Sequence, residues 1–359
     1  MPSRHRQILK YFSLKRISVP IIIGLATATF LFVRDFDSQV FAGIKWTKYS
    51  ALWLALVPVL MIIRDLSYIY RIRLLTDYEL SWKRSFQVIM LWEFASSITP
   101  SVVGGSAVAL FIVHKEGINM GRTTAVVMTT ALLDELFYII MVPTVILITG
   151  TSNLFISEPS FSLAGATLSS KGVFVIGYVF ILLMTATIFA GVFFNPQKVK
   201  QLLISVFKLR FLRRWAHQAE QTGDELITTS SEMKNRPFSF WLKAFFITLL
   251  SWTARFWVVN VMIMAFNPVN QHFLIYARQL IMWVILLISP TPGGSGIAEY
   301  FFPVFLGEFI ENGLATPLAI FWRLISYYPY LFIGVLVLPV WLRRVYFGKR
   351  RNIRFRSVR

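Results

Sequence analysis

The hydrophobic residues of this chain are grouped in long runs, separated by short polar or basic segments. An apolar run of about 17 to 25 residues is long enough to cross a bilayer as a helix. We therefore predict six membrane-spanning helices, at residues 17–33, 49–70, 122–148, 172–194, 238–266 and 317–342.

Two further apolar runs, 87–113 and 273–306, are interrupted. Residues 290–296 contain two prolines and three glycines within seven positions, which removes helix donors and favours a break in the helix. Backbone without helical hydrogen bonds is tolerated at membrane depth only where protein or a water-filled cavity surrounds it. The break therefore marks a candidate site.

The first interrupted run carries a similar motif at residues 98–106. With one residue deleted, both motifs read Ile, a hydroxyl residue, Pro and then Gly-Gly-Ser. Paired breaks of this kind indicate an internal repeat. We predict an all-α integral membrane protein with six transmembrane helices plus two re-entrant helical hairpins in an inverted repeat. Its single membrane domain would comprise a first half (1–170), a second half (171–342) and a basic tail (343–359).

Composition and charge support this topology. The chain of 359 residues is 56% hydrophobic and only 15% charged, yet its net charge is +19. If both interrupted runs return to the side they entered from, one side keeps only four basic residues outside the spans: Arg34, Lys45, Lys48 and Lys171. By the positive-inside rule, both termini are expected in the cytoplasm, in a cell membrane. The net positive charge is then explained without a nucleic-acid partner. The basic segment 195–237 is expected to form an amphipathic helix on the membrane surface.

The motifs define the first set of candidate site residues. The returning half-helices should begin at Gly-Gly-Ser, with Ser106 and Ser295 as N-caps, and a helix N-terminus suits a phosphate or carboxylate. The alternative is that Pro and Gly only allow close helix crossing. The candidate substrate-binding residues are Pro100, Gly104, Gly105, Ser106, Pro290, Pro292, Gly293, Gly294 and Ser295.

Charged residues inside the predicted spans and interrupted runs form the second set: Arg64, Asp65, Glu93, Asp134, Glu135, Arg255, Arg278, Glu299 and Arg323. A charge at the bilayer centre costs about 2.5 to 3.5 kcal/mol on insertion scales, so these side chains should face the protein interior and pair with one another. Arg255 and Arg323 suit a lipid phosphate, because a guanidinium offers bidentate donors. Glu299 follows Ser295 by one turn and should face the same cavity.

Three acidic residues, Glu93, Asp134 and Glu135, are candidates for ion or proton coupling, whereas a structural role is favoured for Arg278. The alternative for each charge is a structural ion pair. Aromatic residues near span ends are expected to be interface anchors: Trp46, Tyr49, Trp241, Tyr276, Tyr330, Trp341 and Tyr346.

Enzymatic chemistry finds little support. The four histidines lie in tails or loops and the chain has no cysteine. Asp134 and Glu135 are adjacent and should point to different helix faces, which argues against a carboxylate pair. We therefore expect no catalytic residue, no metal and no cofactor.

With these residues in hand, the chain resembles the flippase-like, lysylphosphatidylglycerol synthase transmembrane-region family. Residues 290–299 resemble its Pro-x-Pro-Gly-Gly-x-Gly-x-x-Glu signature, and Arg323-Leu324 its later Arg-Leu. The first motif matches at Thr99-Pro100 and Gly104-Gly105, although residues 107–110 replace the acidic and basic positions that the family often has there.

The resemblance implies movement of a phospholipid, in some members an aminoacylated one, between leaflets. Members that synthesise the aminoacyl lipid carry a large soluble domain, which we do not expect here. Alternatives are a transporter of polyprenyl phosphate or a lipid-linked sugar, an enzyme or non-transporting accessory of lipid or envelope biosynthesis, and a scaffold. The expected partners are membrane lipids and, for an accessory, a lipid-synthesising enzyme. The sequence does not define an oligomeric state.

Overall fold

A computed structural model describes residues 46–99, 101–155, 161–163, 166–207, 216–287, 291–311 and 313–347. The predicted first span (17–33), Pro100, Pro290 and most of the basic tail lie outside these residues.

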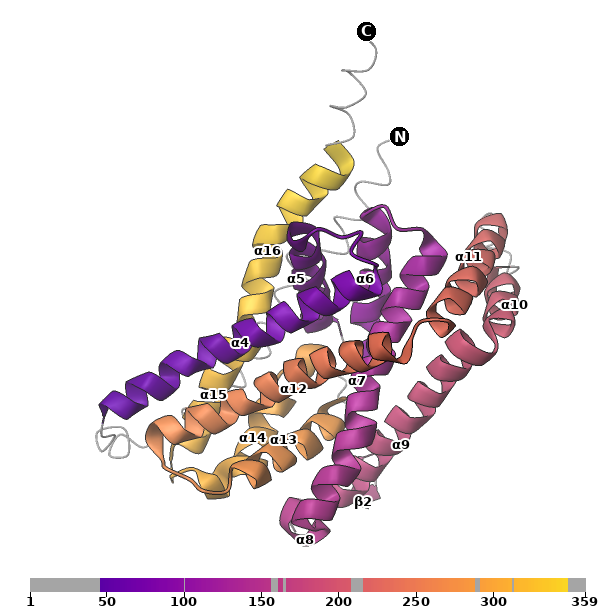
Figure 1. Cartoon of the computed structure of the whole chain (residues 1–359). Helices are drawn as coiled ribbons and strands as arrows, with labels where there is room; N and C mark the ends of the chain where they lie inside the picture. The colour runs from indigo at the N-terminus through magenta and orange to yellow at the C-terminus, as the bar shows by residue number, and fades with distance from the viewer. Residues whose placement is uncertain are drawn as a thin grey trace.

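The described chain is almost entirely helical, with one short antiparallel pair of strands (Figure 1). In chain order the elements are α4 (Lys48–Leu75), α5 (Trp82–Ile98), α6 (Ser101–Lys115), α7 (Met120–Thr149), α8 (Thr151–Leu154), β1 (Phe161–Leu163), β2 (Ala166–Leu168), α9 (Ser170–Phe189) with the π-turn η1 (Ala190–Phe194), α10 (Pro196–Phe207), α11 (Ala216–Lys234), α12 (Phe238–Phe266), α13 (His272–Leu287), the 3₁₀ turn η3 (Pro292–Gly294), α14 (Ile297–Leu306), the 3₁₀ turn η4 (Gly307–Phe309), α15 (Ala315–Ser326), α16 (Tyr328–Leu342) and the π-turn η5 (Arg343–Phe347).

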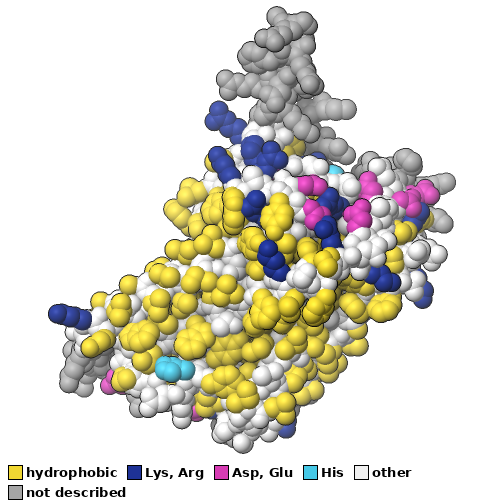
Figure 2. Space-filling view, viewed as in Figure 1, with side chains coloured by type: hydrophobic (Ala, Val, Ile, Leu, Met, Phe, Trp, Pro, Cys, Tyr) yellow, Lys and Arg dark blue, Asp and Glu magenta, His cyan; other side chains and the backbone are white. Residues whose placement is uncertain are grey.

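Five helical segments of the described chain are long and apolar enough to cross a membrane: α4, α7, α9 with η1, α12, and the segment from α15 to η5. They coincide with five of the six predicted spans. Many of their outward side chains are large and hydrophobic, including Leu52, Ile62, Leu183 and Leu250. Figure 2 shows a broad apolar surface on one face of the molecule, with most of the visible charged side chains gathered toward one end. Such a surface is unsuited to water and suited to lipid.

The longest helices pack closely around the centre of the molecule. α4 and α12 lie side by side along much of their length (Figure 1). Local sequence sets the ends of α7: the Asn119 side chain accepts the Arg122 N–H at 2.7 Å, and Gly150 ends the helix with φ 75°.

The basic segment forms α10 and α11, and α11 packs against α7. A β-carbon on Gly121 would lie 2.2 Å from Cβ of Glu225, so glycine allows this close approach. Leu226 and Met233 of α11 are buried in the contact. The predicted helical character of 195–237 is thus observed, and α11 is anchored by protein contacts.

Both predicted interruptions are present. α5 ends at Ile98 and α6 begins at Ser101, so the returning helix starts five residues before the predicted N-cap, Ser106, which lies inside α6. Gly105 of this motif allows close helix packing, because a β-carbon on it would lie 2.0 Å from Oγ of Ser96 on α5.

In the second interruption, α13 ends at Leu287 and α14 begins at Ile297. Gly293, Gly294 and Gly296 adopt φ values of 57°, 68° and 84°, a region that side chains with a β-carbon rarely occupy. The N-cap of α14 is Gly296, so the predicted cap at Ser295 is wrong by one residue.

The last predicted span, 317–342, is not one straight helix. It divides at Tyr327, whose φ of −129° and ψ of −58° end α15, and Pro329 lies at the start of α16. A proline is tolerated in the first turn of a helix, where its missing N–H has no helical partner to lose.

Candidate functional site

A cavity of about 260 Å³ lies between the two interruptions. Its lining includes Ser96, Ser97 and Ser106 from the first and Thr291, Gly293 and Gly294 from the second. The charged residues on its wall are Arg64, Arg71, Glu93, Asp134, Glu135, Arg255 and Arg323. The structure therefore brings together two motifs separated by almost two hundred residues.

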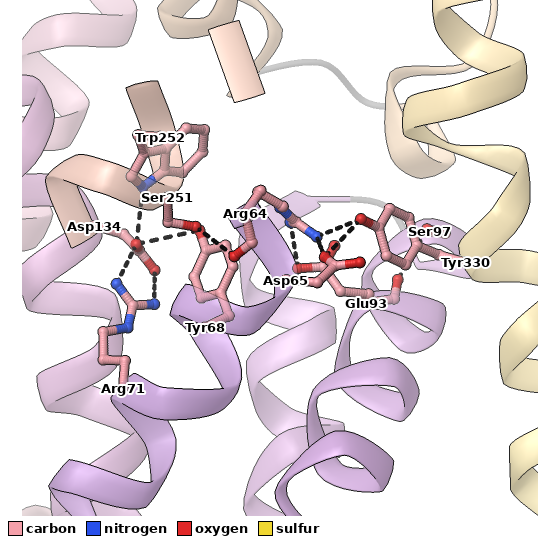
Figure 3. Close-up of polar contacts among 10 residues, drawn as sticks. All are labelled: Arg64, Asp65, Tyr68, Arg71, Glu93, Ser97, Asp134, Ser251, Trp252 and Tyr330. Atoms are coloured by element: carbon pink, nitrogen blue, oxygen red, sulfur yellow. Dashed lines mark hydrogen bonds and ion pairs between the residues drawn. The ribbon is translucent and has the colours of Figure 1, made fainter. Parts of the chain in front are cut away.

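Arg64 of α4 is the centre of the first polar group (Figure 3). Its guanidinium donates to Asp65 at 2.7 Å, to Glu93 of α5 at 2.6 Å and to the Tyr330 hydroxyl of α16 at 2.7 Å. Tyr330 in turn donates to Asp65 at 2.8 Å. Arg64 is 1% exposed, so these partners compensate a charge that has almost no contact with water.

Asp134 of α7 is the centre of the second group. Arg71 of α4 donates to both carboxylate oxygens, at 2.7 and 2.9 Å, and the Trp252 indole of α12 donates at 2.9 Å. Tyr68 adds a longer bond of 3.3 Å from its hydroxyl, and Figure 3 shows this ring between the two groups. These donors compensate the carboxylate for the water that it loses on burial.

Glu299 and Arg323 form the third group. Arg323 Nε donates to Glu299 Oε1 at 3.0 Å, and both residues are buried. The second Glu299 oxygen accepts the Gly296 N–H at 2.8 Å. The Glu299 carboxylate therefore occupies the N-terminus of α14, where we had expected a ligand anion.

Arg323 is also held on its other sides. Its Nη2 donates to the Gly293 carbonyl at 3.0 Å, and its guanidinium lies 3.8 Å from the centre of the Tyr327 ring. Arg323 thus stabilises the backbone of the second interruption. It is less available for a ligand than the sequence suggests.

Tyr327 joins the two interruptions directly. Its hydroxyl accepts a hydrogen bond from Ser295 at 3.1 Å and donates one to the Ser97 carbonyl of α5 at 3.0 Å. Ser295 is fully buried, and its hydroxyl donates to Tyr327 and does not cap a helix.

Arg255 of α12 differs from the other arginines of the cavity. Its guanidinium stacks 4.4 Å from the Trp283 ring centre and lies 5.6 Å from that of Trp252. Among the residues described here, no carboxylate lies within ion-pair distance of Arg255, and its buried Nε has no hydrogen-bond acceptor. The aromatic faces stabilise a cation without neutralising it.

Glu135 of α7 also lines the cavity. It is 4% exposed, and its buried Oε2 has no partner in the described part of the chain. Tyr138, one turn later on α7, also has a buried hydroxyl without a partner. Asp134 and Glu135 do not act as a pair, because only Asp134 is surrounded by donors.

Two further expectations can be compared with the structure. Arg278 lies outside the cavity and binds the carbonyls of Asn153 and Phe305 and the carboxylate of Glu308, which agrees with a structural role. Three expected interface anchors, Tyr276, Tyr330 and Trp341, are instead buried.

Some residues of the site were missed by sequence reasoning. Arg71 follows the span predicted at 49–70 by one residue, but α4 continues to Leu75 and buries it. Trp252 and Tyr327 carry no charge and gave no signal. The pairing of Arg71 could have been found by asking which cation balances Asp134. No cluster of metal-ligating side chains occurs within the described ranges.

Comparison with known proteins agrees with these observations. The family model described as lysylphosphatidylglycerol synthase TM region matches residues 17–334. The chain is 24% identical over 330 residues to a UPF0104 membrane protein of Archaeoglobus fulgidus. The aligned region covers 89% of this chain and 94% of that protein. No solved structure shows a significant match. This chain therefore belongs to the lysylphosphatidylglycerol synthase transmembrane-region family and is a multi-pass membrane protein.

Proposed function

We propose that this protein moves a phospholipid, or an aminoacylated phospholipid, between the leaflets of the cell membrane. The observation that carries the proposal is Arg255, a stacked guanidinium on the wall of a polar cavity, with no carboxylate partner among the described residues. A lipid phosphate is the anion that such a group would meet inside a membrane.

The size of the cavity fits a headgroup. About 260 Å³ is below the range of about 300 to 1,000 Å³ that is usual for whole drug-sized ligands. The acyl chains would therefore stay in the surrounding lipid, and only the headgroup would enter. The serine hydroxyls on the wall would supply further hydrogen bonds.

We further propose the layout of six spans and two re-entrant hairpins in an inverted repeat, with both termini in the cytoplasm. Helix contacts support it. α4 and α12, the second spans of the two halves, pack against each other. The first hairpin, α5–α6, contacts α16, and its counterpart α13–α14 contacts α7 through α13, so each hairpin meets the last span of the other half.

Such a repeat provides a route for transport, because two similar halves of opposite orientation can expose one central site to either side in turn. An enzyme that synthesises the cargo lipid in the same membrane is the partner that this function requires. Polyprenyl phosphates share the phosphate, so the assay should include both cargoes.

The test is reconstitution into liposomes with a fluorescent phosphatidylglycerol or a labelled polyprenyl phosphate. Arg255→Gln should reduce the rate of lipid movement at least tenfold. Lys243→Gln, which removes an exposed cation from the same helix, should not change it. An unchanged rate for correctly folded Arg255→Gln would exclude this site, and no movement of either lipid by the wild type would exclude the function.

A further inference from the structure

The charged side chains of the cavity indicate that an ion takes part in transport together with the lipid. Four guanidiniums, those of Arg64, Arg71, Arg255 and Arg323, contribute to it. Their carboxylates are Asp65 and Glu93 with Arg64, Asp134 with Arg71, and Glu299 with Arg323. Among the described residues these four acids balance the four arginines, and Glu135 is a fifth.

Glu135 is placed where ionisation is costly. It is almost completely buried, no donor reaches its Oε2, and the Asp134 carboxylate, which is paired with Arg71, is its neighbour in sequence. Burial without a hydrogen-bond partner and a nearby like charge both favour the neutral carboxylic acid.

The groups around Glu135 leave Arg255 as the relevant cation. From α4, Arg64 and Arg71 are already ion-paired with Glu93, Asp65 and Asp134. α6, α9 and α13 bring no charged side chain to the described cavity wall. α11 places Glu225 at Gly121, near the start of α7 and away from the cavity. Tyr138, one turn after Glu135 on α7, also lines the cavity.

We propose that Glu135 is the proton-binding residue of the transport cycle, and that it carries a proton whenever an anionic headgroup is bound at Arg255. An anion at Arg255 and an ionised Glu135 would place two negative charges on the wall of one small cavity, where Arg255 is the guanidinium without a carboxylate partner among the described residues. The two negative charges therefore exclude each other, so that binding of the anion favours binding of the proton and the reverse.

This coupling has a defined stoichiometry. One negative headgroup and one proton together carry no net charge, so an anionic lipid would cross without moving charge across the membrane. A pH gradient would then drive net movement, whereas a membrane potential would not. The inference rests on the proposed function and specifies its energy source.

Binding in detergent provides the test. Dioctanoyl phosphatidylglycerol is added to the purified, weakly buffered protein between pH 6 and 10, and a pH indicator reports proton uptake. Above the pH at which the empty site ionises, we expect up to one proton taken up per lipid bound. The affinity should fall up to tenfold for each pH unit in that range. Glycerol phosphate is a parallel probe, which distinguishes a lipid headgroup from a free phosphate ester.

The variants separate the proposal from the alternatives. Glu135→Gln should bind the lipid without proton uptake and with an affinity that does not change with pH, whereas Glu311→Gln, an exposed control, should behave as the wild type. Lipid binding by the wild type without proton uptake over the whole pH range would overturn the proposal even if Glu135→Gln fails to fold. Retention of proton uptake by Glu135→Gln would also overturn it. No lipid binding by the wild type would instead overturn the proposed function, and this inference with it.

Discussion

Arg323 Nε lies 3.0 Å from Glu299 Oε1, and this contact connects α15 to the first turn of α14. The other Glu299 oxygen accepts the Gly296 N–H, so one carboxylate neutralises an arginine and also caps a helix. The pair therefore maintains the shape of the second interruption as well as its charge balance.

The first prediction concerns this pair. Glu299→Gln or Arg323→Gln leaves one buried charge without its partner and should lower the free energy of unfolding by about 3 to 5 kcal/mol. The double variant should cost less than the sum of the single changes, because it leaves no unpaired charge. Thermal unfolding in detergent measures all three.

Transport by the same variants tests whether the pair also matters for function. We expect all three to lose lipid movement, including a double variant that inserts and folds at normal levels. A double variant that moves labelled lipid at the wild-type rate would reduce the pair to a structural element.

The second prediction concerns Asp134. Asp134→Asn should destabilise the protein by about 3 to 5 kcal/mol, because Arg71 is 1% exposed and would lose its only carboxylate among the described residues. The matched control is Asp77→Asn, which breaks ion pairs with Arg122 and Arg236 at a site where Asp77 is 36% exposed. That change should cost about 0 to 1 kcal/mol. Equal losses in the two variants would contradict the burial argument.

The third prediction tests the close contact between α5 and α6. Gly105→Ala should destabilise the protein by about 1 to 3 kcal/mol, because the added methyl group would meet Ser96 Oγ. Adding Ser96→Gly should restore part of the loss, which the unfolding midpoint in detergent would show. Failure of this second change to help would mean that Gly105 is needed for another reason.

The fourth prediction concerns topology. Because the chain has no cysteine, single cysteines can be introduced at the exposed positions Asn119, Ser152, Gln221 and Glu311. An impermeant thiol reagent should label intact cells only at Ser152 and Glu311. External labelling at Gln221 would contradict the re-entrant layout, since α11 would then lie outside.

The positions of the described spans could be predicted from hydropathy alone. The span predicted at 238–266 coincides with α12 at both ends, because apolar length is set by the membrane and not by tertiary contacts. The second interruption was predictable for a similar reason, since clustered proline and glycine disrupt any helix.

Other features depend on contacts that a single sequence does not specify. Tyr330 looked like an interface anchor but is 3% exposed, because its hydroxyl is needed by Arg64 and Asp65. Ser106 looked like an N-cap, but α6 begins earlier and uses Gly105 to approach α5. In each case, a contact with another helix decides the outcome.

The Tyr327 hydroxyl imposes a mechanical constraint on any conformational cycle. Because it bonds both Ser295 and the Ser97 carbonyl, α5 and the second interruption can separate only by breaking at least one of these bonds. Each such bond contributes a net of about 0.5 to 1.5 kcal/mol, which thermal fluctuation readily overcomes. The tyrosine therefore acts as a weak, reversible latch that would synchronise the two breaks without trapping either of them.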